Sequence, residues 1–236
     1  MTQNAYDRFF AEVEDAMEPL TDAQALLPAL CAMERLWQLY LDWTRQDSAY
    51  CLQVKPETLR RPARELLDLL WEQVEAGEAL ARQKDAYDRF LQQVEDSYDD
   101  EDGQDVDFGN ANLLLEALRD YGDIFFPFWD NPLRQDIVYC ATSYLYRYYF
   151  DGLTDRIWRD LGRVPPEEEN RLLEEYAAGD PVWLAECARV RRDLKAARRY
   201  PYSQGWFRRR RKEYSALRLL PIYSSRDGEG NPCIKF

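Results

Sequence analysis

Histidine is missing from all 236 residues of this sequence. Since its imidazole is the usual general base and nucleophile activator of proteins, this absence excludes Ser-His-Asp and Cys-His catalysis. Glycine is also scarce, and the ten glycines are scattered rather than gathered in a phosphate-binding loop. The sequence therefore lacks two of the commonest patterns of an enzyme site.

Cysteine, long apolar runs and leader-like segments are equally limited. The five cysteines are widely spaced without a C-x-x-C pair, which argues against a disulfide framework and a cysteine-based zinc site. No run approaches the ~18 apolar residues of a membrane helix. The first residues do not show the basic-then-apolar pattern of a signal peptide. We expect a cytoplasmic protein with no metal, no cofactor and no membrane partner.

The residues that are present describe a globular chain with an uneven charge. Hydrophobic residues make up 46% of the sequence and aromatic residues 14%, which suffices for a folded core. The net charge is −13. Residues 189–218 hold twelve basic residues against two acidic ones, whereas residues 1–188 hold 40 acidic against 17 basic. The sequence predicts an acidic body with a basic C-terminal segment.

Two segments recur in the same order along the chain. Residues 5–15 read AYDRFFAEVED and residues 86–96 read AYDRFLQQVED. Residues 45–51 read RQDSAYC and residues 134–140 read RQDIVYC. Self-similarity of this kind indicates a repeat. We predict a tandem duplication that gives one pseudo-symmetric domain, followed by an extension. The predicted regions are copy 1 at 1–82, copy 2 at 83–163 with an acidic loop at 98–108, and a basic helical extension with a tail at 164–236.

Apolar residues in both copies recur at helical spacing, so we predict an all-α fold. Prolines mark the expected starts of helices. We predict one helix that begins at Pro62 and another that runs from Pro132 to Phe150. The extension is expected to form helices at 167–178, at 181–199 and from Trp206, and then a short irregular or β-hairpin tail.

The repeated RQDxxYC motif is the most specific feature. On a helix, its Asp and Tyr share one face at i and i+3. One interpretation is a pair of partner-binding sites; the other, which we favour, is a structural lock in which each Asp meets a neighbouring helix. Aromatic residues also crowd the segment 125–150, which predicts core packing first and a partner groove second. The partner-binding candidates of the motif are Arg45, Asp47, Tyr50, Arg134, Asp136 and Tyr139.

The basic segment 189–214 mixes cations with aromatic rings, and this combination is typical of nucleic-acid binding. The alternative, which we favour, is that the segment docks on its own acidic body or on an acidic partner, because the body would repel a polyanion. The candidate residues are Arg189, Arg192, Lys195, Arg199, Trp206, Arg208, Arg209, Arg210, Arg211 and Lys212.

These observations support one leading functional hypothesis and two alternatives. The leading hypothesis is a non-enzymatic, protein-binding protein of bacterial character (an inhibitor, adaptor or immunity-like protein) whose acidic body engages a basic partner. The first alternative is a nucleic-acid-associated protein that uses residues 189–214, or an acidic mimic of DNA. The second is a carboxylate-dependent metal enzyme that uses Asp47 and Asp136.

Overall fold

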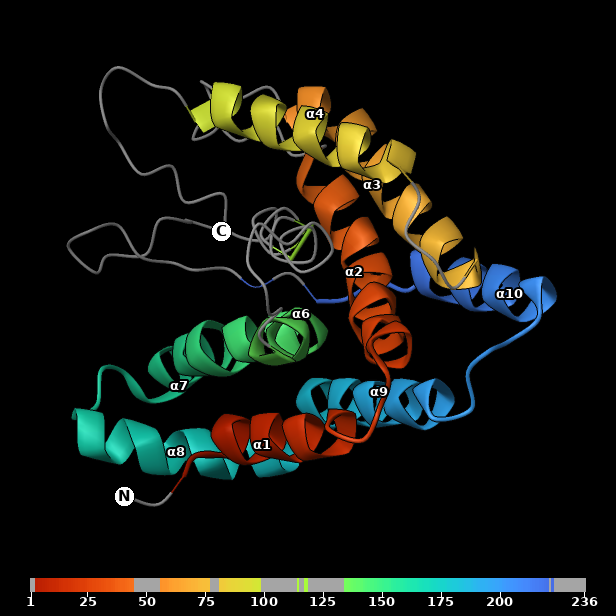
Figure 1. The fold of residues 1–236 in the computed structure, drawn as a ribbon. Coiled ribbons are helices and arrows are strands. Elements are labelled where there is room, and N and C mark those ends of the chain that lie inside the picture. The colour runs from red at the N-terminus through yellow and green to blue at the C-terminus, as the bar shows by residue number, and fades with distance from the viewer. Residues whose placement is uncertain are drawn as a thin grey trace.

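A computed structural model describes residues 3–44, 56–76, 81–98, 134–220 and 222, together with positions 114, 117 and 118. Every regular element in this part of the chain is helical, which confirms the predicted all-α class (Figure 1). The helices are α1 (Ala5–Met17), α2 (Asp22–Thr44), α3 (Pro56–Ala76), α4 (Ala81–Tyr98), α6 (Arg134–Arg147), the π-helical η1 (Tyr148–Leu153), α7 (Thr154–Leu161), α8 (Pro166–Gly179), α9 (Pro181–Ala197) and α10 (Gln204–Ser215).

Helix α2 forms the centre of the molecule. It crosses the middle of the fold and contacts α3, α6, α9 and α10 (Figure 1). From Ala25 to Leu41 every side chain is buried except the half-buried Gln38. A helix that is covered on all sides is stabilised by burial around its whole circumference. The apolar side chains of α2 join those of the surrounding helices in one continuous core.

Helix α1 lies on the opposite side of α6 and α9 from the α3–α4 pair, and it packs on α6 and α9 (Figure 1). Asn4 caps it by accepting a hydrogen bond from the Asp7 backbone N–H at 2.8 Å. Its buried residues include Tyr6, Phe9 and Val13, at the spacing that the sequence indicated. α1 therefore presents one face to α6 and its other faces to solvent, α8 and α9.

Two predicted helix boundaries are wrong. Helix α3 begins at Pro56, so Pro62 lies inside it. A proline removes one i→i−4 hydrogen bond, but the buried face that includes Leu66 and Leu70 stabilises the helix across that gap. The helix predicted to end at Phe150 also continues, because the chain widens into η1 and passes directly into α7. The wider π turn changes the direction in which the following side chains point, but the helix continues.

The extension is described over residues 164–220 and at residue 222, and its helices lie close to their predicted positions. Pro166 begins α8, and Asp180 caps α9 by accepting a hydrogen bond from the Trp183 N–H at 2.7 Å. α9 and α10 both pack on α2, so the extension shares the core of the first region. None of the described helices is long and apolar enough to cross a membrane.

The tandem duplication stays a prediction. Helices α1 and α4 carry the repeated segments 5–15 and 86–96 and bury corresponding residues, such as Phe9 and Phe90. Their surroundings differ, however, because α4 packs on α3. The segment 45–51, the acidic stretch 99–108 and the tail 223–236 lie outside the described residues.

Candidate functional site

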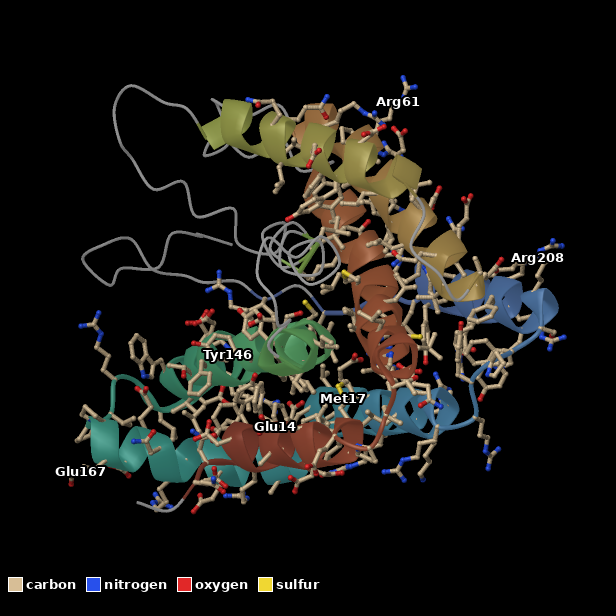
Figure 2. All side chains as sticks on the ribbon, in the orientation of Figure 1. Glu14, Met17, Arg61, Tyr146, Glu167 and Arg208 are labelled. Carbon is tan, nitrogen blue, oxygen red and sulfur yellow. The ribbon has the colours of Figure 1, made fainter. Side chains whose placement is uncertain are left out.

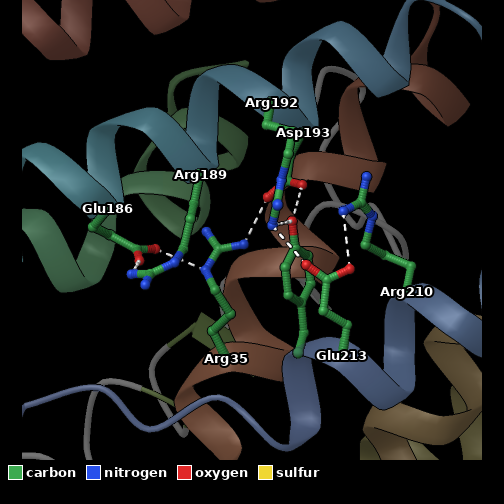
Figure 3. A network of polar contacts seen from close by, with 8 residues as sticks. Arg35, Glu186, Arg189, Arg192, Asp193, Arg210 and Glu213 are labelled. Atoms are coloured by element: carbon green, nitrogen blue, oxygen red, sulfur yellow. Dashed lines mark hydrogen bonds and ion pairs between the residues drawn. The ribbon is translucent and has the colours of Figure 1, made fainter.

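Two buried polar networks fix the helices around α2. In the first, Arg35 of α2 is fully buried between two carboxylates of α9 (Figure 3). Its Nε donates to Glu186 Oε1 at 2.7 Å and its Nη1 donates to Asp193 Oδ2 at 2.6 Å. The Tyr214 hydroxyl of α10 donates to the other oxygen of Asp193. One arginine thus ties α2 to α9, and one tyrosine extends the tie to α10.

The charges of this network serve to hold α2 and α9 together. Burial raises the pKa of Asp193, although the Arg35 charge and the Tyr214 hydrogen bond both act to lower it. The side chains of Arg35 and Asp193 at its centre are fully buried, whereas Arg189 and Arg192 at its edge are partly exposed. A buried ion pair of this kind fixes helix positions rather than meeting a substrate.

The second network is centred on Glu34, the neighbour of Arg35. Its carboxylate is buried and accepts hydrogen bonds from Arg64 Nη1 at 2.9 Å and from the Trp71 indole N–H at 2.7 Å, both on α3. Arg211 of α10 approaches the same carboxylate and pairs with Asp68 of α3. Adjacent residues of α2 therefore bind α3 and α9 through opposite charges.

These contacts divide the predicted basic segment into two halves. Arg189 pairs with Glu186, Arg192 and Arg210 pair with Glu213, and Arg211 pairs with Asp68. The half-buried Trp206 stacks on Tyr202. We call these contacting residues the inner half of the segment. Among their ion pairs with described residues, only those of Arg211 reach another helix of the acidic body, because Glu186 shares α9 with Arg189 and Glu213 belongs to the basic segment itself. Docking of the segment on the body therefore stays a prediction. The other candidates are exposed, namely Lys195, Arg199, Arg208, Arg209 and Lys212.

A third feature is a cluster of five rings between α1 and the α6–η1 segment. The ring centroids of Tyr146 and Phe150 lie 4.9 Å apart, and both rings contact Tyr6, at 5.3 and 5.8 Å. Phe10 lies 5.9 Å from Tyr6, and Tyr139 lies 6.0 Å from Tyr146. We call these five residues the aromatic patch. Tyr146 is labelled in Figure 2, in the space between the α6–α7 segment and α1.

The aromatic patch combines a buried base with an accessible surface. Tyr6 is buried, and its hydroxyl forms a hydrogen bond with Thr142 Oγ1 at 3.2 Å. Tyr146 is 37% exposed and Phe150 is half-buried. Phe10 and Tyr139 are half-buried as well. The outer rings therefore reach solvent while their inner edges are held by the core.

Three carboxylates lie one helical turn from rings of the aromatic patch. Asp7 and Glu14 precede and follow Phe10 by three and four residues on α1, and Asp136 precedes Tyr139 by three residues on α6. Asp7 and Asp136 are exposed, Glu14 is half-buried, and no described cation forms an ion pair with any of them. We call these three residues the acidic rim.

The pKa of the Tyr6 hydroxyl depends on its burial and on these neighbours. Burial is the main reason that its pKa is raised to about 12, and the Thr142 hydrogen bond acts in the opposite direction. The neighbouring Tyr139, Tyr146 and Asp7 add smaller electrostatic increments in the same direction as burial. Asp7 is therefore close enough to place negative potential on the rings.

Two residues of the second RQDxxYC copy belong to the aromatic patch and the acidic rim. Asp136 belongs to the acidic rim and Tyr139 to the aromatic patch. The motif residues that lie outside the described residues are Arg45, Asp47 and Tyr50, together with the side chain of Arg134. Consequently the pairing of the two copies and the proposed Asp47–Asp136 metal site stay predictions. Over the described part of the chain, no group of three possible ligands is placed to hold a metal ion.

The sequence places the aromatic residues of 125–150, which include Tyr146 and Phe150, in core packing first, and it does not single out Tyr6 or Phe10 as part of a surface. One signal in the sequence points further. Phe9 and Phe10 are adjacent, and adjacent residues on a helix face directions about 100° apart, so both cannot face one neighbour. Phe9 faces α9, where its ring lies 6.3 Å from Trp183, which turns Phe10 toward the edge of α1 beside Asp7 and Glu14.

A groove of about 320 Å³ opens on the other side of α1, against α8 and α9. Two ion pairs cross its edges, Arg8 with Glu174 and Arg191 with Glu12, at 2.7 and 2.6 Å. Each charge at this groove is matched by one of opposite sign. The acidic rim differs from this groove because its carboxylates have no such partner among the described residues.

No family model matches the chain, and no curated protein or solved structure is found to be similar to it.

Proposed function

We propose that this protein is a non-enzymatic, protein-binding protein, and that its aromatic patch and acidic rim receive a basic segment of a partner protein. The observation that supports this proposal is that three carboxylates, which form no ion pair with the described residues, lie one helical turn from partly exposed rings. Elsewhere on the described surface, many carboxylates are paired with arginines, as Glu12 and Glu174 are.

Arginine is the side chain that fits this arrangement best. A guanidinium group stacks on aromatic rings and forms bidentate hydrogen bonds with carboxylates, whereas an ammonium group does the second only as a point charge. We propose that a guanidinium of the partner stacks on Tyr146 and pairs with a carboxylate of the acidic rim. We therefore propose an arginine-rich partner segment rather than a generally cationic one.

The patch is also rigid before any partner arrives. Tyr6 is held by its hydrogen bond to Thr142, and the rings of Tyr146 and Phe150 pack against it. Preorganised rings lose little conformational freedom on binding, and aromatic residues dominate the binding energy of protein interfaces. The net charge of −13 would further raise the rate of encounter with a basic partner.

Fluorescence anisotropy with a labelled peptide of alternating arginine and serine tests this function. The test variant is Asp7→Asn/Glu14→Gln/Asp136→Asn. A matched control removes the same charge from exposed positions on α4 and α8 through Asp85→Asn/Asp88→Asn/Glu167→Gln. At roughly 0.5 kcal/mol for each charge, the test variant should weaken peptide binding about tenfold at low salt, and the control far less.

Two further comparisons separate a specific site from general attraction. The wild type should bind the arginine peptide more tightly than the equivalent lysine peptide, and Tyr146→Ser should remove most of that preference. Equal weakening by the test and control variants would contradict the proposed surface. So would equal binding of the arginine and lysine peptides by the wild type.

A further inference from the structure

The outer half of the basic segment forms a second charged surface, distant in sequence from the acidic rim. Figure 1 shows that the end of α9 and the start of α10 are joined by a short linker at one side of the molecule, and Arg208 points outward there in Figure 2. Six exposed cations in total flank this linker. We call them the cationic edge: Lys195, Arg198, Arg199, Arg208, Arg209 and Lys212.

The cationic edge contains positive charge without compensation. No side chain of the six forms an ion pair or hydrogen bond with the described residues, in contrast to the paired Arg192, Arg210 and Arg211. Residues 194–212 contain no Asp or Glu. The positive end of the α10 helix dipole lies in the same stretch and adds to the same potential.

The remaining surface of this stretch is polar. Its fully exposed residues other than the cations are Pro201, Ser203, Gln204 and Gly205, and its half-buried rings, Tyr200, Tyr202 and Trp206, pack against the core and are not free to serve as an apolar anchor. A protein interface usually needs such an anchor, whereas binding to a phosphate backbone does not. The composition of the cationic edge therefore favours a phosphate polymer over an acidic protein.

The rings of this segment are already engaged. Tyr202 and Trp206 stack on each other with centroids 3.9 Å apart and planes 8° apart, and the Arg210 guanidinium lies over Trp206 at 5.0 Å. Phe207 is buried. These contacts leave Trp206 little free face on which a base could stack. Recognition at this edge would therefore involve phosphates rather than bases.

We propose that the cationic edge binds the phosphodiester backbone of a nucleic acid without sequence preference. Arginine supplies four of the six cations and forms bidentate, charge-assisted hydrogen bonds with phosphate oxygens. The acidic body repels a polyanion at long range and so lowers its rate of encounter, but it does not cancel contacts made at the edge itself, because interactions between exposed charges more than about 8 Å apart are largely screened at physiological ionic strength. The binding is sensitive to salt and separate from the protein-binding surface on α1 and α6.

Fluorescence anisotropy across a salt series tests this proposal, with labelled single-stranded and double-stranded DNA and RNA of mixed sequence. The test variant is Arg208→Gln/Arg209→Gln/Lys212→Gln. Its control, Arg60→Gln/Arg61→Gln/Arg159→Gln, makes the same change of charge at exposed positions on α3 and α7. Glutamine keeps most of the helix propensity of arginine and lysine, and circular dichroism verifies the fold.

The expected result follows from counterion release. Six phosphate contacts should lower the binding constant by about a thousandfold between 50 and 200 mM salt, and loss of three contacts should reduce the slope of log K against log salt by about 2 to 3. The control variant should retain the wild-type slope. Absence of binding at 50 mM salt would overturn the proposal. Equal slopes in the two variants would also overturn it, and so would competition by polyglutamate as effective as competition by unlabelled oligonucleotide.

Discussion

Replacing Arg35 by methionine is the perturbation whose consequence the structure specifies most fully. The substitution keeps a long side chain in the core but removes the charge that pairs with Glu186 and Asp193 at 2.7 and 2.6 Å. Glu186 retains Arg189 at 2.9 Å, and Asp193 retains the Tyr214 hydroxyl. Asp193 therefore becomes a buried carboxylate with no cationic partner from α2.

The magnitude of this loss is that of a broken buried ion pair, about 3–5 kcal/mol of unfolding free energy. Whole-domain stabilities are typically about 5–15 kcal/mol, so Arg35→Met should bring the protein close to unfolding at neutral pH. Adding Asp193→Asn to Arg35→Met should recover part of the loss. The second substitution removes the uncompensated charge while keeping an oxygen that accepts from Tyr214.

The loss should also depend on pH. Burial raises the pKa of Asp193 above its unfolded value, and the Arg35 charge opposes that rise, so Arg35→Met should raise this pKa further. A carboxyl group whose pKa is higher in the folded state lowers stability at pH values above that pKa. The penalty disappears as pH falls toward the unfolded pKa. The difference between wild type and variant should therefore be smaller at pH 5 than at pH 7.

Urea denaturation followed by tryptophan fluorescence measures these quantities, with seven tryptophans as the probe. Wild type, Arg35→Met and Arg35→Met/Asp193→Asn would be compared at pH 7 and at pH 5. A loss below about 1 kcal/mol for Arg35→Met at pH 7 would refute the assigned role of the network. An identical loss at the two pH values would refute the part of the reasoning that concerns Asp193.

Two other substitutions test the remaining buried contacts. Trp71→Phe keeps most of the packing but removes the indole donor to Glu34, and the unfolding free energy should fall by about 1.5–3 kcal/mol because the acceptor is charged; urea denaturation measures it. Asp180→Ala removes the cap on the Trp183 N–H and the partner of Arg156, and should lower the thermal midpoint through a loss of about 1–2 kcal/mol. An unchanged denaturation profile in either variant would contradict the corresponding contact.

Much of the fold can be predicted from the sequence because its helices have local signals. Apolar residues at helical spacing and the break at Pro165–Pro166 locate most of the helices. Asp180 followed by Pro181 marks the start of α9 for a physical reason, since a capping side chain and a residue without an N–H both suit a first turn. These rules need no knowledge of the tertiary structure.

The two incorrect boundaries arise where tertiary packing overrides a local signal. Pro62 resembles a helix start, but α3 continues through it because its apolar face is buried on both sides of the proline. Phe150 resembles a helix end because Gly152 follows shortly after. The chain instead forms a π turn and remains helical into α7. Neither outcome follows from propensity alone.

The candidate site was harder to predict because its members come from segments more than a hundred residues apart. Tyr6 and Tyr146 meet only because α1 packs on α6. The adjacent buried residues Glu34 and Arg35 present the same difficulty. Two charged residues inside the apolar stretch of α2 must have partners, but the sequence does not show which residues those are. Only the fold identifies α3 and α9 as the sources of those partners.

Hydrogen exchange measured by mass spectrometry, with and without the arginine–serine peptide, tests most directly whether the aromatic patch and acidic rim form the protein-binding surface. The account predicts slower exchange in fragments from Ala5–Met17 and Arg134–Leu153, and no such slowing in the Asp7→Asn/Glu14→Gln/Asp136→Asn variant. Slower exchange confined to other helices, or an equal response in that variant, would contradict the account.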